Sequence, residues 1–300
     1  MRLVYLLLIT ASLVCASDWF PLQIGNQWVY RLDEGPVKDI RTVSIVGKVT
    51  AHEREYFLYN GIWGEQLRLR YNSNGKLVKL LPDGSEAVWA DFQAEEGALY
   101  DARVDDCSGP ATVESRSAKL ELPRRTFEGA LAVSYKPNCA DAGVTRDVFV
   151  QGIGLAEREY ASFSGPRRYR LSSARIGDTV VLTAGEHAFR LSLDHLVYPE
   201  EFRYQARLTL ENTTGEPLVL RFPSGQVYEL TIRNSLGHLV YTWSSDKLFI
   251  AALVEIPVVG ERNWAVSESL RLTPGRYLFE ARLVTTDQPG YSASIPFTVQ

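Results

Sequence analysis

The chain has 300 residues, which is long enough for two domains that each bury a core of their own. Hydrophobic residues make up 45% of it and charged residues 23%, a balance typical of a globular protein and not of a disordered one. The formal net charge of -4 gives no electrostatic basis for binding nucleic acid. The one basic cluster, Arg167, Arg168 and Arg170, is best interpreted as the solvated face of a strand.

The first 16 residues predict a signal peptide for export. Arg2 supplies the positive end, residues 3–14 the apolar segment, and the residues up to Ala16 the small side chains of a cleavage site. A lipid anchor at Cys15 is not expected, because Val14 precedes it where a lipobox has a small residue. No later stretch is apolar for long enough to span a membrane. We therefore expect a freely exported chain, either periplasmic or extracellular.

Residues 17–175 predict a β-rich first domain. Its opening, DWFPLQIGNQWVYR from 18 to 31, resembles the FPL-x-x-G-N-x-W-x-Y start of bacterial secreted modules whose function is uncharacterised. The segment VFVQGIGLAEREY, from 148 to 160, resembles the end of the same modules. Only the patch from 91 to 100 predicts a helix.

Two cysteines remain after the predicted cleavage site, Cys107 and Cys139. An exported protein with two cysteines usually pairs them, so we expect a disulfide between these two. Neither has a CxxC partner or a nearby histidine, which argues against a metal site or a catalytic thiol.

We place the domain boundary at a linker of residues 176–187. The part that follows, residues 188–300, alternates apolar and polar side chains, as in RYLFEARLV from 276 to 284, and turn residues separate the alternating runs. We expect nine short strands in this part. The prediction is an all-β protein of two antiparallel domains, the second an immunoglobulin-like sandwich.

The C-terminal part also resembles a known family, named after the Bacillus intracellular proteinase inhibitor (BsuPI). The resemblance covers roughly residues 188–299 and implies a protein partner, for which the family name suggests a serine protease of the subtilisin type. Its shared features are Asn212 to Thr214, Phe222, Ser224 to Gln226, Tyr228, the turn from Asn234 to Gly237, Trp243, Ser244, Asp246, Lys247, Phe249 and the closing segment LTPGRYLFEARL.

Inhibition would require a rigid, exposed loop that enters the protease cleft. The best candidate in the sequence is Ser244, Ser245, Asp246 and Lys247, which lie between two predicted strands. The alternative is that these four residues are a polar connection of a hairpin. Three aromatic residues near this loop, Tyr228, Trp243 and Phe249, fit the core of a sandwich.

The sequence contains no recognisable catalytic or metal-binding motif. There is no G-x-S-x-G, the four histidines form no H-x-H or H-x-x-x-H pair, and Asp194 and His195 are neighbours that would point to opposite faces of a strand. We therefore expect neither cofactor nor metal, and a non-enzymatic binding protein. Two alternatives remain: a structural, envelope-associated protein that assembles or binds a surface polymer, and a secreted hydrolase with dispersed carboxylates.

Overall fold

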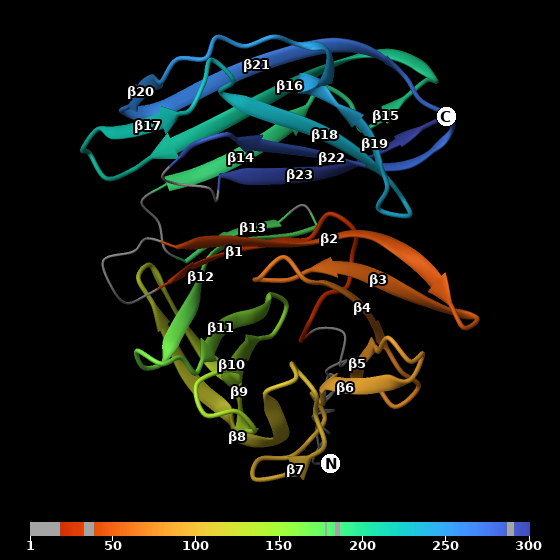
Figure 1. Ribbon diagram of the computed structural model, residues 1–300, viewed down its shortest axis with the longest axis vertical. Coiled ribbons are helices and arrows are strands. Elements are labelled where there is room, and N and C mark those ends of the chain that lie inside the picture. Colours follow the sequence, from red (N-terminus) through yellow and green to blue (C-terminus); the bar gives the residue numbers. More distant parts are fainter. Residues whose placement is uncertain (1–18, 33–38, 178, 184–186, 287–290) are drawn as a thin grey trace, which may run out of the picture.

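The computed structural model describes residues 19–32, 39–177, 179–183, 187–286 and 291–300 (Figure 1). The predicted signal peptide, with Cys15, lies outside the described residues. The described chain is almost entirely β, and its one helical segment is a single 3-10 turn, η2 (Trp243–Asp246). No helix in the described part is long and apolar enough to cross a membrane. The all-β prediction is therefore confirmed.

The helix predicted for residues 91–100 is wrong. The Asp91 side chain accepts a hydrogen bond from the backbone N–H of Gln93, which favours a turn, and Gly97 has a positive φ of 81°. The backbone N–H of Gly97 donates to Val113 O, on a neighbouring strand. The backbone of this segment thus forms turns, with Ala98 N donating to Glu95 O, and bonds across to a neighbouring strand.

The first domain is one large antiparallel sheet, in which thirteen strands lie within the described residues. Each strand pairs with the next along the chain, except that β6 does not pair with β7, and these two strands form the ends of the sheet. The two halves of the sheet are joined where β1 pairs with β12. The sheet curls around its own core (Figure 1). The strands are β1 (Gln27–Leu32), β2 (Ile40–Ala51), β3 (Arg54–Asn60), β4 (Gln66–Tyr71), β5 (Leu77–Leu80), β6 (Glu86–Ala90), β7 (Leu99–Tyr100), β8 (Ser108–Leu122), β9 (Arg125–Pro137), β10 (Val144–Val150), β11 (Gly154–Tyr160), β12 (Arg167–Ile176) and β13 (Thr179–Leu182).

Aromatic side chains fill the space inside this curled sheet. Phe20, from the segment before β1, stacks on Trp28 with ring centroids 5.4 Å apart. Trp28 Nε1 donates to the backbone oxygen of Ile153 at 2.6 Å, and the Tyr30 hydroxyl donates to that of Leu155 at 2.7 Å. These bonds satisfy the polar ends of two fully buried rings and fix the register of β1 against the opposite side of the core.

A buried ion pair lies in the same core. Arg158 on β11 and Asp147 on β10 are 4% and 1% exposed, and they form two hydrogen bonds of 2.7 and 2.6 Å. The guanidinium carbon lies 5.1 Å from the Trp89 ring centroid, and the Tyr135 hydroxyl donates to the same carboxylate. Burial lowers the pKa of Arg158, but the Asp147 carboxylate and the nearby Tyr160 and Tyr59 together raise it more, so the guanidinium stays charged.

The segment predicted as a linker, residues 176–187, is partly strand. β13 pairs with β12, from Ser173 opposite Leu182 to Ile176 opposite Thr179. Much of this stretch therefore belongs to the sheet of the first domain. The exact boundary stays a prediction, since residues 184–186 lie outside the described part.

The second domain contains two main sheets that face each other. One has the order β14-β16-β21 and the other β15-β23-β22-β18-β19, with β17 and β20 as a separate pair. The pairings are antiparallel except β15 with β23. Side chains from both sheets meet in one core, for example Tyr204 against Phe279. Its strands are β14 (His187–Leu193), β15 (Val197–Tyr198), β16 (Glu201–Asn212), β17 (Leu218–Phe222), β18 (Tyr228–Asn234), β19 (Leu239–Thr242), β20 (Val254–Val258), β21 (Gly260–Arg271), β22 (Gly275–Leu283) and β23 (Ser292–Val299).

The two domains touch through the turn between β18 and β19, which reaches β2 and β3 (Figure 1). Lys48 N donates to Ser235 O at 2.7 Å, and a Cβ on Gly47 would lie 2.6 Å from the backbone nitrogen of Gly237. Leu278 packs with Val46 in a small apolar cluster between the domains. Glycine at 47 is thus required by the close approach of the two backbones.

Candidate functional site

The most exposed apolar segment of the second domain follows η2 and ends before β20. Residues 247–253, called the 247–253 loop from here on, connect these two elements outside any strand. Leu248 is 101% exposed, Leu253 80% and Ile250 67%. Leucine and isoleucine side chains are usually buried, so three of them exposed together on one loop indicate a surface that binds something.

An aromatic stack supports this loop from below. Phe249 points back to Trp243, with ring centroids 5.7 Å apart, and Trp243 packs on Tyr228 at 4.7 Å. Trp243 Nε1 donates to Glu268 at 3.2 Å. The Phe249 ring thus anchors the middle of the loop while Leu248 and Ile250, on either side of it, are exposed.

A second anchor lies on the other side of the loop. The backbone N–H of Gly225 donates to Ile250 O at 2.9 Å. A Cβ on Gly225 would lie 2.8 Å from Ile250 Cγ1, which is closer than atoms normally pack. The close approach of the loop therefore favours glycine at position 225.

The four residues selected from the sequence lie directly before this loop. Ser244 and Ser245 are in η2, where the Ser244 hydroxyl donates to Glu229 and the Ser245 hydroxyl to Thr242 O. Their side chains therefore hold the 3-10 turn together. Asp246 is exposed at the end of η2.

Lys247 is the junction between η2 and the 247–253 loop. Its ammonium group lies 3.1 Å from Glu268, 3.3 Å from Asp246 and 5.1 Å from the Trp243 ring centroid. The hydrogen bond to Glu268 raises the pKa of Lys247. In the free protein this side chain faces its own domain, and Leu248 is the first side chain that points fully outward.

Sequence reasoning missed Leu248, Ile250 and Leu253 as functional candidates. The sequence does contain a pattern that marks this loop. Residues 248–253 are all apolar and lack the alternation of a half-buried strand. A continuous apolar run suggests a buried segment, so exposure of this run could not be inferred from the pattern alone.

The other sites suggested by the sequence are structural. Cys107 and Cys139 form the expected disulfide, with Cα atoms 5.1 Å apart. The basic residues Arg168 and Arg170 are neutralised by Glu159 and Glu157, at 2.8 and 2.7 Å. Among the residues that the structure describes, no group of three or more His, Cys, Asp or Glu side chains is placed to hold a metal ion.

Comparison with known proteins supports the family resemblance of the second domain. Residues 191–288 match the family described as intracellular proteinase inhibitor, which confirms the resemblance for the C-terminal third of the chain. The comparison with curated proteins found no match.

Solved structures that are similar to this chain share little of it. A Pseudomonas fluorescens alkylpurine DNA glycosylase, AlkC, bound to DNA with an abasic site analogue is 20% identical over 39% of this chain, with a TM-score of 0.26. A β-glucosidase from Erythrobacter marinus is 10% identical over 40% of this chain, with a TM-score of 0.24. The matched parts span 31% and 16% of those two chains.

Proposed function

We propose that this chain is an exported, non-enzymatic binding protein whose second domain inhibits a serine protease with the 247–253 loop. The match of residues 191–288 to the proteinase inhibitor family supports a protein-interaction role of the inhibitor type. The single observation that carries the finer proposal is the loop itself, with Leu248 fully exposed and Phe249 anchored beneath it.

These two anchors matter because a flexible loop would lose conformational entropy on binding, and this cost would reduce the affinity of the inhibitor. Here the backbone is tied to Gly225, and the Phe249 ring is held by the stack on Trp243. A loop that is ordered before it binds retains more of its contact energy as affinity. The two anchors leave Leu248 and Ile250 available to a partner.

The chemistry of the exposed side chains selects the class of protease. A large, uncharged Leu248 would suit an apolar specificity pocket, as in subtilisin-like or chymotrypsin-like enzymes, and not a pocket with an acid at its base. Lys247 would serve a trypsin-like pocket, but its ammonium group is already bound by Glu268. The proposed target is therefore a serine protease that cleaves after large apolar residues.

The test is a titration of the purified mature chain against subtilisin, chymotrypsin and trypsin, with residual activity and the intactness of the chain as readouts. We expect stoichiometric loss of subtilisin or chymotrypsin activity with the chain uncut. Leu248→Ala should weaken inhibition by roughly 10- to 100-fold, because burial of a leucine side chain is worth about 1.5–3 kcal/mol.

The matched control is Phe163→Ala, which removes an equally exposed apolar side chain, 93% exposed, from the first domain. This variant should inhibit like the unchanged protein. Full protease activity at excess inhibitor, or steady digestion of the loop, would refute the proposal and favour the structural, envelope-associated alternative.

A further inference from the structure

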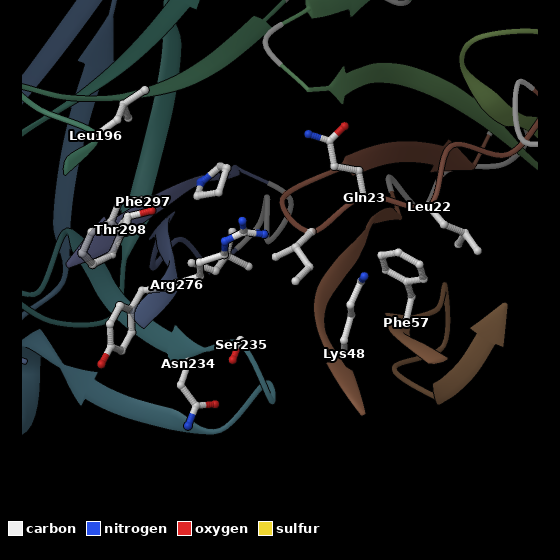
Figure 2. Close-up of a pocket in the computed structure, with 14 residues that line it drawn as sticks. Leu22, Gln23, Lys48, Phe57, Leu196, Asn234, Ser235, Arg276, Phe297 and Thr298 are labelled. Carbon is white, nitrogen blue, oxygen red and sulfur yellow. The ribbon is translucent and has the colours of Figure 1, made fainter. Parts of the chain in front are cut away.

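A cleft of about 550 Å³ lies between the two domains, away from the 247–253 loop. The first domain contributes Leu22, Ile24 and Phe57 to its lining, and the second contributes Leu278 and Phe297. Figure 2 shows Leu22, Phe57 and Phe297 among them. Binding sites for small molecules are commonly clefts of about 300–1,000 Å³ with apolar walls and a few polar groups, and they often lie between domains. The size, lining and position of this cleft match that description.

Two cations face this cleft, one from each domain. Figure 2 shows Lys48 beside Phe57 on one side and Arg276 beside Phe297 on the other. None of the described residues that line the cleft is acidic. The charged side chains that line the cleft are therefore both basic, although the protein as a whole carries a net charge of -4.

The two cations differ in how they are held. Lys48 Nζ is bound by Glu55 at 2.7 Å and lies 4.5 Å from the Phe57 ring centroid. Arg276 is exposed at the start of β22, and no described carboxylate forms an ion pair with it. A guanidinium binds carboxylate or phosphate groups through two parallel hydrogen bonds. We therefore expect Arg276 to form the main contact with a bound anion.

We propose that this cleft binds a small organic anion with an apolar body. The anionic head, a carboxylate or a phosphate ester, would bind Arg276 with Lys48 nearby, and the apolar body would lie against Leu22, Ile24 and Phe57. Both domains supply side chains that contact the bound anion, so binding requires the two domains to be docked as they are here. This site is separate from the proposed inhibitory loop and does not depend on protease inhibition.

Isothermal titration of the purified mature chain with decanoate and with decyl phosphate tests the proposal. Decanamide, which has the same chain length without the charge, is the ligand control. We expect saturable binding of one anion per chain, with decanamide about tenfold weaker or more, because a hydrogen bond to a charged group is worth about 1.5–3 kcal/mol. The tighter of the two anions identifies the preferred head group.

Variants assign the binding to the cleft. Arg276→Gln should weaken decanoate binding about tenfold or more, and Lys48→Gln less, because Glu55 already occupies Lys48. The matched control Arg282→Gln removes another exposed arginine of β22 that does not line the cleft, and its affinity should be unchanged. The proposal is overturned if neither anion binds saturably, or if Arg276→Gln binds as tightly as Arg282→Gln.

Discussion

Loss of either partner of the buried pair Arg158–Asp147 should destabilise the first domain strongly. Asp147→Asn keeps the shape of the side chain but leaves the guanidinium of Arg158, which is 4% exposed, without a counter-charge. Removal of one partner of a buried ion pair typically costs about 3–5 kcal/mol. The total stability of a domain is only about 5–15 kcal/mol, so much of it would be lost.

The complementary variant Arg158→Met should show a different pH dependence. It leaves a carboxylate in the core, and this group can take up a proton and so lose its charge. The folded state of this variant would then bind more protons than the unfolded state, so the stability that the variant loses relative to the unchanged protein should become smaller as pH falls, by at most about 1.4 kcal/mol per pH unit. An arginine cannot lose its proton in this range, so the cost of Asp147→Asn should stay nearly constant from pH 7 to pH 5.

Urea denaturation followed by tryptophan fluorescence measures both variants, since Trp89 lies beside Arg158. The control is Glu114→Gln, which breaks the half-exposed pair of Arg146 and Glu114 and should cost less than about 1 kcal/mol. If Asp147→Asn costs no more than Glu114→Gln, or if the two core variants respond to pH in the same way, the reasoning about the buried charges is wrong.

Three further outcomes are expected. Reduction of the Cys107–Cys139 disulfide should lower the free energy of unfolding by about 3–4 kcal/mol, which urea titration with and without dithiothreitol would measure. Burial raises the pKa of Glu86, but the hydrogen bonds to Arg70 and Tyr56 and the charges of Arg70 and Arg54 together lower it more. Glu86 therefore stabilises the fold above its unfolded pKa, and this contribution is lost as pH falls. Urea titration of Glu86→Gln should show a smaller loss of stability than the unchanged protein between about pH 5 and pH 3, and an equal loss would contradict this. Gly47→Ala should weaken the contact between the domains, because the added Cβ would lie 2.6 Å from Gly237 N, and so lower the free energy of unfolding in urea; an unchanged value would show that the contact with the hairpin turn adjusts.

Strands of the second domain were predictable where one face of the sheet is buried. In β22, Tyr277, Phe279 and Ala281 point inward, as their alternation predicts. Leu278 lies on the other face and is nevertheless 1% exposed, because the first domain covers it together with Val46. The burial of Leu278 depends on the docking of the two domains, so it could not be predicted from the alternation of residues within one strand.

Polar residues were a poor guide to the candidate site. Glu229 alternates with the apolar Tyr228 and Leu230, yet it is only 7% exposed, and Ser244 and Gln226 bind its carboxylate. The loop from Ser244 to Lys247 was selected because its residues are typical of an exposed turn. The structure instead exposes the apolar residues that follow, and this depends on the two anchors at Gly225 and Phe249, which come from contacts distant in sequence.

The pairing of β1 with β12 bears on how the first domain forms as the chain is made. Other neighbouring strands in that sheet are consecutive in sequence, but Gln27 pairs with Arg175, about 150 residues away, which costs about 2 kcal/mol more loop-closure entropy than a ten-residue hairpin. Until β12 emerges, β1 has an unpaired edge that can pair with another chain. The nascent protein is therefore most prone to aggregation shortly before its first domain is complete. A chain truncated before residue 167 should keep the unpaired edge of β1 and remain prone to aggregation.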